Sequence, residues 1–393
     1  MAVIDKEKRP YKICGITTRA MTLKSFMIEP MKFLCENGFA CYAICQQDGS
    51  INEQEVKPVV YLPMEMQSGA VSPLEIIKVT WKLFKLFRKE RFDIVQYASS
   101  NAGLYAALAS WMARVPIRVF CQWGVIYTDY TGIKKFFYKS IEKITCWLST
   151  SVQPDSPTNL EFALSEGLYR RGKGYVIYNG SATGVDLNKF NRNKREEWRN
   201  EVLSNLSIPK DAYVFGFVGR QCPEKGVNEL YEAFLSIASR NDNVYLIVVG
   251  PVETPNRLKK ELYDTVQTHP RIKLVGRVAE TSVYYASFDM LILPSYREGF
   301  GMVLLEAAAT GTPSIISNII GPTDLIKDRY NGFVCEVRST QSLEDKMNEA
   351  LSLSPIKKCE IENNAYQVAA MKYNVVDFNR HLLANRLSLI EKK

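Results

Sequence analysis

The sequence predicts an α/β protein of two doubly wound domains in tandem, each built on a parallel sheet flanked by helices. Short apolar runs alternate with amphipathic helical stretches along the chain, which is typical of parallel sheets. With 393 residues the chain also exceeds the usual size of a single hydrophobic core. A polar stretch at residues 188–197 interrupts the alternation, and we expect the domain boundary there.

The first domain is expected to span residues 1–190. Several of its candidate strands are followed by turn or small polar residues, such as Ser99 and Ser100. Ligands of open α/β sheets bind outside the carboxyl ends of the strands, so residues at those ends are the first candidates for a site. The candidate strands cover residues 11–17, 40–45, 59–62, 93–97, 117–122, 149–153 and 175–178.

The second domain is expected to span residues 191–360. Residues 361–393 have a helical pattern, and we expect a C-terminal helix that packs across the domain junction. Two doubly wound domains in tandem would leave a crevice between them. The candidate strands cover residues 214–218, 245–249, 272–275, 290–293, 314–316 and 333–337, and helices begin near Val227, Leu258, Met302 and Ser342.

The composition is that of an ordinary soluble protein, with 46% apolar and 23% charged residues. The apolar run at residues 102–113 is shorter than the roughly 20 residues that cross a bilayer. The charged N-terminus lacks the apolar core of a secretory signal. Nine cysteines without a C-x-x-C pair indicate buried reduced thiols rather than disulfides or a zinc site. These features predict a cytoplasmic protein.

The chain has few histidines for a catalytic triad or a metal site. It has two histidines, His269 and His381, and neither lies in a motif, so we expect no metal site and no histidine triad. The net charge of +8 favours anionic partners such as phosphates or an acidic membrane face. Nucleic acid fits this charge less well, because no nucleic-acid-binding motif accompanies it.

The most informative segment, residues 289–313, reads as strand, loop, helix and stop. Gly299 and Gly301 let the backbone approach a ligand at the helix start, where free N–H groups and the helix dipole suit a diphosphate. Of Glu298 in the loop and Glu306 in the helix, one carboxylate would hold sugar hydroxyls and the other ribose hydroxyls. Two glutamates at such a spacing also occur as ordinary surface carboxylates. The glycines and the strand–loop–helix context favour the binding role.

A second feature lies at the start of the same domain. The strand at residues 214–218 ends in Gly219, and Arg220 and Lys225 follow in the loop before a helix. Two cations at the carboxyl end of a strand can neutralise a leaving diphosphate, on which negative charge grows in the transition state. The alternative is two ordinary surface cations. Their position after the glycine of the first strand favours the functional interpretation.

Together these motifs resemble family 4 glycosyltransferases of the GT-B fold, in which two Rossmann-like domains face each other across a cleft. The resemblance covers essentially the whole chain. Within the family, the chain looks closest to bacterial capsular and cell-surface polysaccharide transferases, which extend polyprenyl-diphosphate-linked oligosaccharides. The similar segments are the Glu298–Glu306 pair with its Gly-Phe-Gly, the Gly219–Gly226 loop, Val176–Gly180, Gly184–Phe190 and Asn331–Val334.

The resemblance implies a role for each of these residues. Arg220 and Lys225 would bind the donor diphosphate, Glu298 the donor sugar and Glu306 the ribose. Transfer would retain the anomeric configuration, by front-face attack through an oxocarbenium-like state, without an obligatory metal or other cofactor. The implied catalytic residues are Glu298, Arg220 and Lys225, and the implied donor-binding residues are Gly219, Arg220, Lys225, Glu298, Gly299, Phe300, Gly301, Met302, Val303 and Glu306.

The first domain departs from the family pattern at two places. Many members carry a histidine after one strand, where this chain has Gln122 and Trp123. The loop with Thr17, Thr18 and Arg19 lacks the paired glycines often seen there. These five residues are the acceptor-side candidates. Arg19 would meet an acceptor phosphate, and the alternative is an ordinary exposed arginine.

Two stretches of the first domain, residues 76–91 and 133–148, carry basic faces. One interpretation is a pair of amphipathic helices with solvated polar faces. The other is docking to an anionic membrane leaflet, with Trp81 and Phe84 inserted at the interface. The apolar positions are Ile76, Val79, Leu83 and Phe87, then Phe137, Ile141, Ile144 and Leu148; the lysines are Lys78, Lys82, Lys85 and Lys89, then Lys135 and Lys139.

The resemblance therefore predicts a retaining hexosyltransferase. It would move a hexose or N-acetylhexosamine from a nucleotide sugar, UDP-linked in the simplest case, to a polyprenyl-diphosphate-linked or glycan acceptor in capsule or surface polysaccharide synthesis. It would work in the cytoplasm, with peripheral contact to the inner face of the cell membrane.

The alternatives are a non-catalytic binder of carbohydrates or lipid head groups, a sugar-nucleotide epimerase that needs no acceptor, and a phosphorylase. The binder would hold a nucleotide sugar without turnover. An NAD enzyme is not expected, because Leu304 stands where a dinucleotide fingerprint needs its third glycine.

Overall fold

The computed structural model describes residues 9–67, 69, 72–253 and 257–393. The chain separates into two compact units: unit 1 contains residues 1–183 and 376–393, and unit 2 contains residues 184–375. Each unit is built on a six-stranded sheet in which all neighbouring strands are parallel. The predicted class, two doubly wound α/β domains, is confirmed.

The sheet of unit 1 has the order β3-β2-β1-β4-β5-β6, so the strand order reverses between β1 and β4. The predicted strand at 175–178 is wrong. Beside β6, one isolated bridge joins Val152 to Gly174, and no strand forms at residues 175–178. The chain turns at Tyr178, where φ is 54°. The strands are β1 (Tyr11–Ile16), β2 (Phe39–Ile44), β3 (Val60–Tyr61), β4 (Ile94–Ala98), β5 (Ile117–Gln122) and β6 (Ser151–Pro154).

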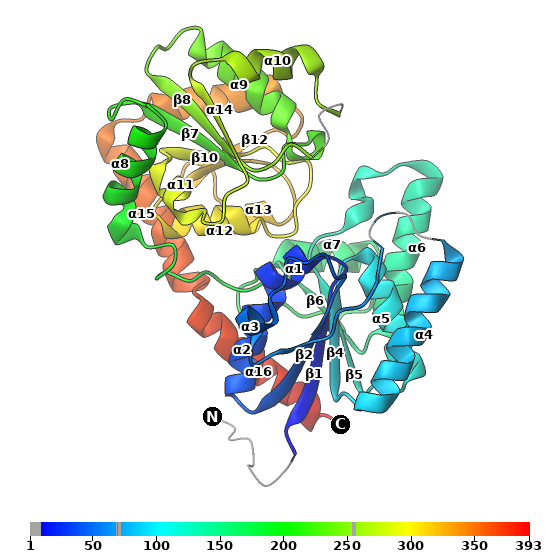
Figure 1. Cartoon of the computed structure of the whole chain (residues 1–393). Coiled ribbons are helices and arrows are strands. Elements are labelled where there is room, and N and C mark those ends of the chain that lie inside the picture. Colours follow the sequence, from blue (N-terminus) through cyan, green and yellow to red (C-terminus); the bar gives the residue numbers. More distant parts are fainter. Residues whose placement is uncertain (1–8, 68, 70–71, 254–256) are drawn as a thin grey trace. The chain divides into compact units, whose positions relative to one another are not determined.

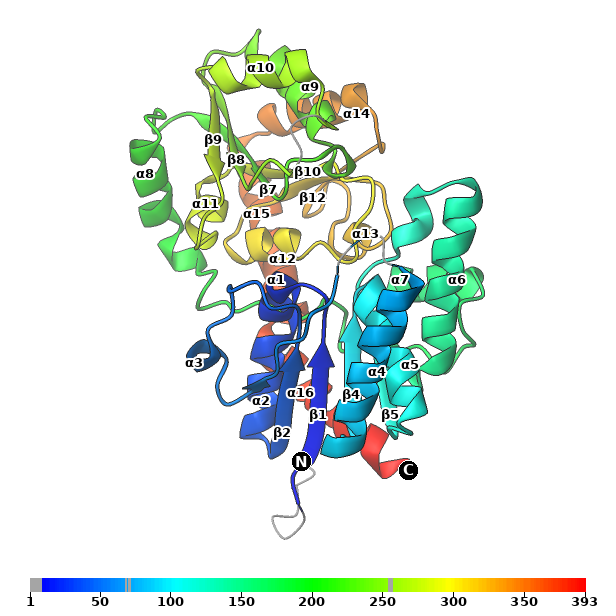
Figure 2. The same ribbon diagram turned by 45° about the vertical axis from the view of Figure 1, so that its right-hand side comes forward.

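Helices cover both faces of this sheet (Figures 1 and 2). Alternate strand residues point to opposite faces: Cys14 and Ile16 pack under α4, α5 and α6, whereas Ile13 packs under α1, α2 and α16. The helices are α1 (Ala20–Leu23), a π-helical turn (Lys24–Ile28), α2 (Glu29–Glu36), α3 (Glu53–Val56), α4 (Pro73–Glu90), α5 (Ser100–Met112), a 3-10 turn (Ile126–Asp129), α6 (Gly132–Leu148), α7 (Pro157–Ser165) and α16 (Val375–Glu391).

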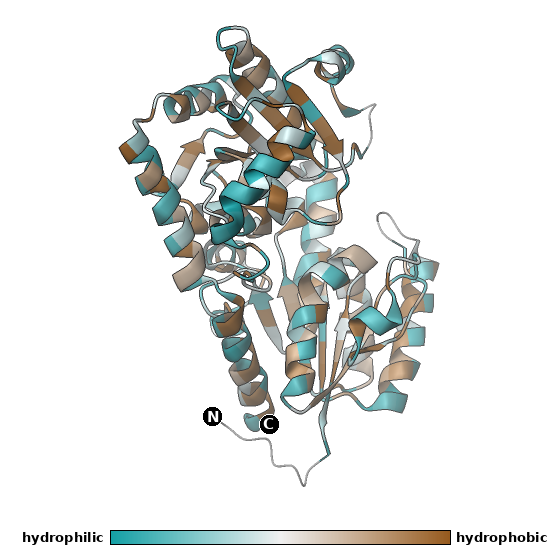
Figure 3. Cartoon of the chain, turned by 60° about the vertical axis from the view of Figure 1, so that its left-hand side comes forward, coloured by the Kyte–Doolittle hydropathy of each residue, from teal (hydrophilic) through white to brown (hydrophobic). Residues whose placement is uncertain are grey.

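The sheet of unit 2 has the order β12-β11-β10-β7-β8-β9, so it repeats the topology of unit 1, with the reversal between β7 and β10. Its strands are almost entirely hydrophobic, as expected for a parallel sheet buried on both faces, and Figure 3 shows this colouring. The strands are β7 (Tyr213–Val218), β8 (Val244–Val249), β9 (Ile272–Gly276), β10 (Met290–Leu293), β11 (Ser314–Ser317) and β12 (Gly332–Cys335).

Two helical layers enclose the sheet of unit 2. Phe215 and Phe217 pack under α9, α10 and α14, whereas Val214 and Val218 pack under α8, α11, α12 and α15. The helices are two 3-10 turns (Arg192–Lys194 and Pro223–Lys225), α8 (Arg195–Asn205), α9 (Val227–Ala238), α10 (Lys260–Thr268), α11 (Ser282–Ser287), α12 (Met302–Ala309), α13 (Pro322–Leu325), α14 (Thr340–Leu351) and α15 (Pro355–Lys372).

The C-terminal segment contains two helices rather than one. Helix α15 packs within unit 2, and α16 returns to unit 1, where Phe378 and Leu382 enter the core. Arg386 of α16 is buried and donates to the amide oxygens of Gln96 and Gln153, at 3.0 and 2.7 Å. The first boundary between the units falls at Thr183–Gly184, just before the polar stretch, which leads through a 3-10 turn into α8 of unit 2.

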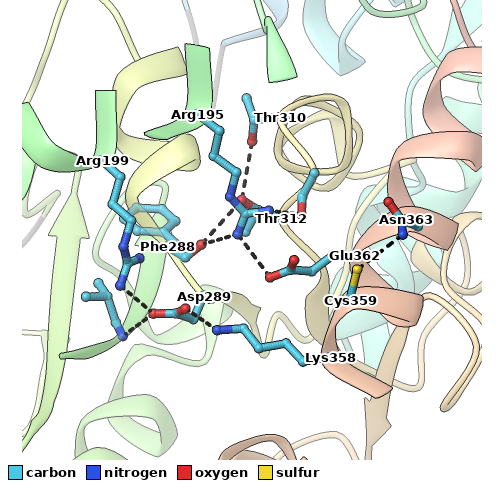
Figure 4. A network of polar contacts seen from close by, with 12 residues as sticks. Arg195, Arg199, Phe288, Asp289, Thr310, Thr312, Lys358, Cys359, Glu362 and Asn363 are labelled. Atoms are coloured by element: carbon cyan, nitrogen blue, oxygen red, sulfur yellow. Dashed lines mark hydrogen bonds and ion pairs between the residues drawn. The ribbon is translucent and has the colours of Figure 1, made fainter. Parts of the chain in front are cut away.

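A charged cluster ties α8 and α15 to the amino end of β10 (Figure 4). The buried carboxylate of Asp289 accepts from Arg199 Nη2 at 3.0 Å, Lys358 Nζ at 2.5 Å and the Val214 N–H at 2.8 Å. Arg195 donates to the Phe288 carbonyl at 3.1 Å, beside this cluster. The two cations hold the pKa of Asp289 below its usual value, against the opposing effect of burial.

Among the residues that the structure describes, no helix has the length and apolar character that crossing a membrane requires. Within the same residues, no three His, Cys, Asp or Glu side chains are grouped so that they could hold a metal ion.

Candidate functional site

The candidate site of unit 2 lies at the carboxyl edge of its sheet, where the strand order reverses between β7 and β10. There the loop after β7, residues 219–226, meets the loop after β10, residues 294–301. Glycine permits this close approach, because a Cβ on Gly226 would lie 2.0 Å from the Pro294 carbonyl oxygen. This is the edge at which open α/β sheets bind their ligands.

An ion pair between Lys225 and Glu298 joins the two loops. Lys225 Nζ lies 2.5 Å from Glu298 Oε1, and the side chains are 22% and 13% exposed. The Ser295 hydroxyl donates to the same carboxylate oxygen at 2.7 Å. The structure thus brings together one cation and one carboxylate that the motifs single out separately. Ser295 was not predicted, and its only signal in the sequence is its position directly after the strand and Pro294.

Arg220 lies in the same loop as Lys225 but has a different partner. Its half-exposed guanidinium pairs with Glu253, in the segment after β8. The next residue, Gln221, fixes the loop backbone: its amide donates to the Gly250 carbonyl at 2.9 Å and accepts from the Tyr231 hydroxyl at 2.6 Å. Arg220 is therefore carried by a firmly held loop, and its guanidinium is accessible to a ligand.

Glycines shape the start of α12. Gly301 precedes the helix with φ 85°, in the left-handed region that favours glycine. A Cβ on Gly321 would lie 1.7 Å from the Gly299 carbonyl oxygen, so a second loop also packs tightly here. Met302 and Val303 supply the first N–H groups of the helix, which have no acceptor within the helix. These N–H groups can therefore donate hydrogen bonds to an anion at the helix start.

Phe300 belongs to the core rather than to the surface of the site. Its side chain is buried, and its ring centroid lies 5.2 Å from that of Tyr373. Only the backbone of Phe300 can therefore take part in the predicted donor site. Its side chain anchors the loop that carries Glu298.

Glu306 lies one turn into α12 and contacts α11. The Tyr285 hydroxyl donates to Glu306 Oε2 at 2.7 Å. Burial raises the pKa of Glu306 to about 7, and the nearby charge of Glu280 adds to this, whereas the Tyr285 hydrogen bond and the charge of Lys189 act in the opposite direction. Glu306 can thus change its protonation state near neutral pH, and Tyr285 is a partner that no sequence pattern indicated.

Tyr296 braces the loop that carries Glu298. Its N–H donates to the Glu224 carbonyl at 2.9 Å, and its hydroxyl donates to Glu229 Oε1 at 2.5 Å. The Arg338 guanidinium stacks over its ring, 4.5 Å from the centroid. These contacts hold the β10 loop against the β7 loop.

The acceptor-side candidates of unit 1 lie at the carboxyl edge of its own sheet. Thr17 and Thr18 are buried, and the Thr18 hydroxyl lies 2.8 Å from that of Ser99. Arg19 is exposed at the start of α1, and Trp123 is partly exposed after β5. Arg19 and Trp123 are therefore the two whose side chains reach the surface.

Gln122 is engaged inside unit 1. Its amide donates to Glu142 Oε1 at 2.7 Å and accepts from the Tyr169 hydroxyl at 3.2 Å. Glu142 is buried, and burial raises its pKa to about 7 despite the hydrogen bond from Gln122. The amide therefore supports the backbone next to Trp123.

Two sequence families match the chain. Residues 198–368, in unit 2, match the family described as glycosyl transferases group 1. Residues 12–153, in unit 1, match the family described as glycosyl transferase 4-like. Each match covers nearly all of the sheet of one unit, and the match in unit 2 contains Arg220, Lys225, Glu298 and Glu306.

Three curated proteins are similar to the chain over most of their length. The capsular polysaccharide biosynthesis glycosyltransferase CapM of Staphylococcus aureus is 27% identical, over 82% of this chain and 83% of the relative. An Escherichia coli UDP-Gal:alpha-D-GlcNAc-diphosphoundecaprenol alpha-1,3-galactosyltransferase is 28% identical, over 80% and 81%. A Campylobacter jejuni N,N'-diacetylbacillosaminyl-diphospho-undecaprenol alpha-1,3-N-acetylgalactosaminyltransferase is 24% identical, over 89% and 92%.

Solved structures share the fold. A glycosyltransferase from Rickettsia africae superposes with a TM-score of 0.79 at 20% identity, over 98% of this chain and all of the other. Anabaena HepE in complex with UDP-glucose gives a TM-score of 0.75 at 22% identity, over 96% of this chain and 99% of the other. The two Rossmann-like units are those of the GT-B architecture.

Proposed function

Since the chain belongs to the group 1 glycosyltransferases, we propose that it moves a hexose or N-acetylhexosamine from a UDP-linked donor to a lipid-linked or glycan acceptor, with retention of the anomeric configuration. The observation that carries this proposal is the Lys225–Glu298 pair at the reversal point of the unit 2 sheet. The E. coli relative is named for UDP-galactose, and Anabaena HepE was crystallised with UDP-glucose, which supports UDP as the carrier.

In this proposal the donor diphosphate lies between Lys225, Arg220 and the first N–H groups of α12. These groups meet the negative charge that grows on the diphosphate as the glycosidic bond breaks. Glu298 holds the sugar hydroxyls and Glu306 the ribose hydroxyls. The cations and the helix start supply the charge stabilisation, so no step is assigned to a metal ion.

The acceptor is proposed to be a polyprenyl-diphosphate-linked glycan. Two of the relatives are named for diphosphoundecaprenol-linked acceptors. Arg19, exposed at the carboxyl edge of the unit 1 sheet, is the cation available to an acceptor phosphate. We place the enzyme in the cytoplasm, with peripheral contact to the anionic inner face of the membrane.

Calorimetric titration with UDP, GDP and ADP tests the donor site. We expect micromolar binding of UDP and a loss of at least tenfold in affinity for Glu306→Ala. Binding of GDP or ADP in preference to UDP would overturn the choice of carrier, and binding of none would overturn the donor site. Nucleotide-sugar binding without turnover on any lipid-linked acceptor would favour a non-catalytic binder.

A further inference from the structure

Helix α6 carries large apolar side chains on its outer face. Their exposed fractions are 89% for Ile133, 74% for Phe136, 57% for Phe137, 45% for Ile144 and 70% for Trp147. At 100° per residue these five positions fall within a stripe roughly 100° wide. We call this set the α6 stripe. Contiguous exposed apolar surface of this kind marks an interaction site rather than ordinary protein surface.

The α6 stripe is not the face by which the helix packs on its own unit. Three of the four buried residues of α6, Glu142, Thr145 and Cys146, lie on the opposite side of the helix, and the fourth, Leu148, is its last residue. Glu142 can be a core residue because Gln122 donates to it. Helical spacing in the sequence places Phe137, Ile144 and Leu148 in one apolar set. In the structure only Leu148 of these three is buried, and the other two are exposed.

The charges around the stripe are basic. Helix α6 contains four lysines, and its one acidic residue, Glu142, is buried. Glu166 pairs with one of these lysines, Lys139. Exposed apolar side chains flanked by lysines suit the boundary between the phosphates and acyl chains of an anionic bilayer. A symmetric contact between two copies of this chain is less suitable, because it would bring the same lysines together.

Helix α4, which packs on the other side of α5, also exposes apolar side chains. Its first turns expose Leu74, Ile77 and Trp81, at 79%, 65% and 49%. Helix α5 packs between α4 and α6 (Figure 2). Phe84, which the sequence suggested as an inserting residue with Trp81, instead stacks on Trp81 at 5.0 Å and packs against the core.

The direction of the helices places the stripe near the candidate acceptor residues. Helix α6 follows β5 in a parallel sheet, so it begins at the carboxyl edge of the strands. The most exposed residues of the stripe, Ile133 and Phe136, lie in its first two turns. Arg19 and Trp123 also follow their strands at this edge.

We propose that the α6 stripe inserts at the headgroup–acyl boundary of an anionic membrane, and that this holds the carboxyl edge of the unit 1 sheet at the bilayer surface. The evidence for the docking surface is its exposure and its charge. The role of docking in bringing the acceptor to the enzyme rests on the proposed function. A lipid-linked acceptor keeps its phosphates at that boundary, so docking there brings the acceptor to the edge that carries Arg19.

Vesicle co-sedimentation tests the proposal, with phosphatidylcholine vesicles and with vesicles containing 30% phosphatidylglycerol. The test variant is the triple Ile133→Ser, Phe136→Ser and Phe137→Ser. The matched control is Ile356→Ser, an isoleucine of α15 that is 84% exposed. We expect the wild-type chain and the control to bind the anionic vesicles, and the triple variant to bind on the order of 100-fold less tightly. Lys134→Gln with Lys135→Gln should weaken binding by about fivefold per lysine, only on anionic vesicles.

UDP titration and thermal unfolding of each variant distinguish failure of docking from failure of folding or of the donor site. Loss of vesicle binding in the triple variant with unchanged UDP affinity supports the stripe. Equal vesicle binding by the triple variant and the wild-type chain overturns the proposal. Failure of the wild-type chain to bind anionic vesicles overturns it as well. A dimer in sedimentation velocity that only the triple variant abolishes, with vesicle binding unaffected, also overturns it and assigns the stripe to a second copy of the chain.

Discussion

Lys225 and Glu298 neutralise each other in the ligand-free protein. Their charged atoms lie 2.5 Å apart, and the Ser295 hydroxyl holds the same carboxylate oxygen. A diphosphate that approaches this pair offers Lys225 a second anion. Under the proposed function, the pair keeps the lysine oriented before the donor arrives, and it leaves Glu298 positioned beside the sugar. Such preorganisation lowers the cost of reorientation during reaction.

Lys225→Ala should lower kcat by about 100- to 1,000-fold, because the leaving diphosphate loses a cation that acts in the transition state. The release of UDP from a UDP-sugar in the presence of a lipid-linked acceptor measures this rate. Ser295→Ala is the matched control, since it removes the other partner of Glu298 and keeps both charges; we expect it to lower kcat by less than about tenfold. Equal effects of the two substitutions would show that Lys225 has only a positioning role.

In the proposed donor site, Glu306 should make donor binding dependent on pH. With a pKa of about 7, its carboxyl group is protonated in much of the ligand-free protein at neutral pH. Ribose hydroxyls donate to the ionised form. Affinity for UDP-glucose should therefore fall by up to about tenfold per pH unit below pH 7 and level off above it. The diphosphate of UDP-glucose does not titrate in this range, so calorimetry between pH 5.5 and 8.5 reports the protein.

Two variants assign this pH dependence to Glu306. Glu306→Gln should give a flat profile. Tyr285→Phe removes the hydrogen bond that lowers the pKa, so its affinity should begin to fall at a higher pH than that of the wild-type chain. A flat wild-type profile would contradict the ribose role of the carboxylate.

At the scale of elements, the charged cluster at Asp289 holds two helices to the second sheet. Asp289 directly precedes β10, so the cluster lies at the amino end of the strand, and the candidate site lies at the other end. Arg199 comes from α8 and Lys358 from α15. The Asp289 carboxylate is 8% exposed, which places the ion pairs near the interior, where removing one partner is costly.

Asp289→Asn should destabilise unit 2 by about 2–3 kcal/mol at pH 7, somewhat less than a fully buried pair, because both cations are partly exposed. The pKa of Asp289 is lowered in the folded state, so its contribution is fully present above the unfolded pKa of about 4 and is lost as the pH falls further. Urea unfolding at several pH values measures this. The difference between the two proteins should be constant from pH 7 to 5 and shrink below pH 4, and a difference that grows there would contradict the assignment.

At the scale of the whole molecule, the chain begins and ends in unit 1. Helix α16 covers one face of the unit 1 sheet, where Phe378 and Leu382 are 1% and 4% exposed. The candidate donor-side residues all lie within residues 184–375. Unit 1 therefore depends on helix α16 for its core, whereas the candidate donor site of unit 2 does not include this helix.

Replacing both Phe378 and Leu382 by alanine should cost roughly 5–8 kcal/mol, enough to unfold a domain of ordinary stability. We expect proteolysis to degrade unit 1 and to leave unit 2 intact, with UDP binding retained. Val376→Ala on the same helix is the control, because Val376 is 55% exposed. If UDP binding disappears in the double variant, the donor site depends on a folded unit 1.

The sequence by itself determined the fold class and singled out the segments of the candidate donor site. Alternating apolar runs, the glycines at 219, 226, 299 and 301, and the strand–loop–helix order are properties of near neighbours in the chain, so they can be read locally. For the same reason the sheet strands of unit 2 match their expected positions closely.

The tertiary structure decided which of these residues meet. The pairing of Lys225 with Glu298 and of Glu306 with Tyr285 depends on which loops and helices the sheet order places side by side. Packing against distant segments likewise buried the Phe300 side chain in the core. It also left the α6 stripe exposed, because Glu142 on the other side of the helix is buried and accepts a hydrogen bond from Gln122. Spacing along the chain carries no information about those partners.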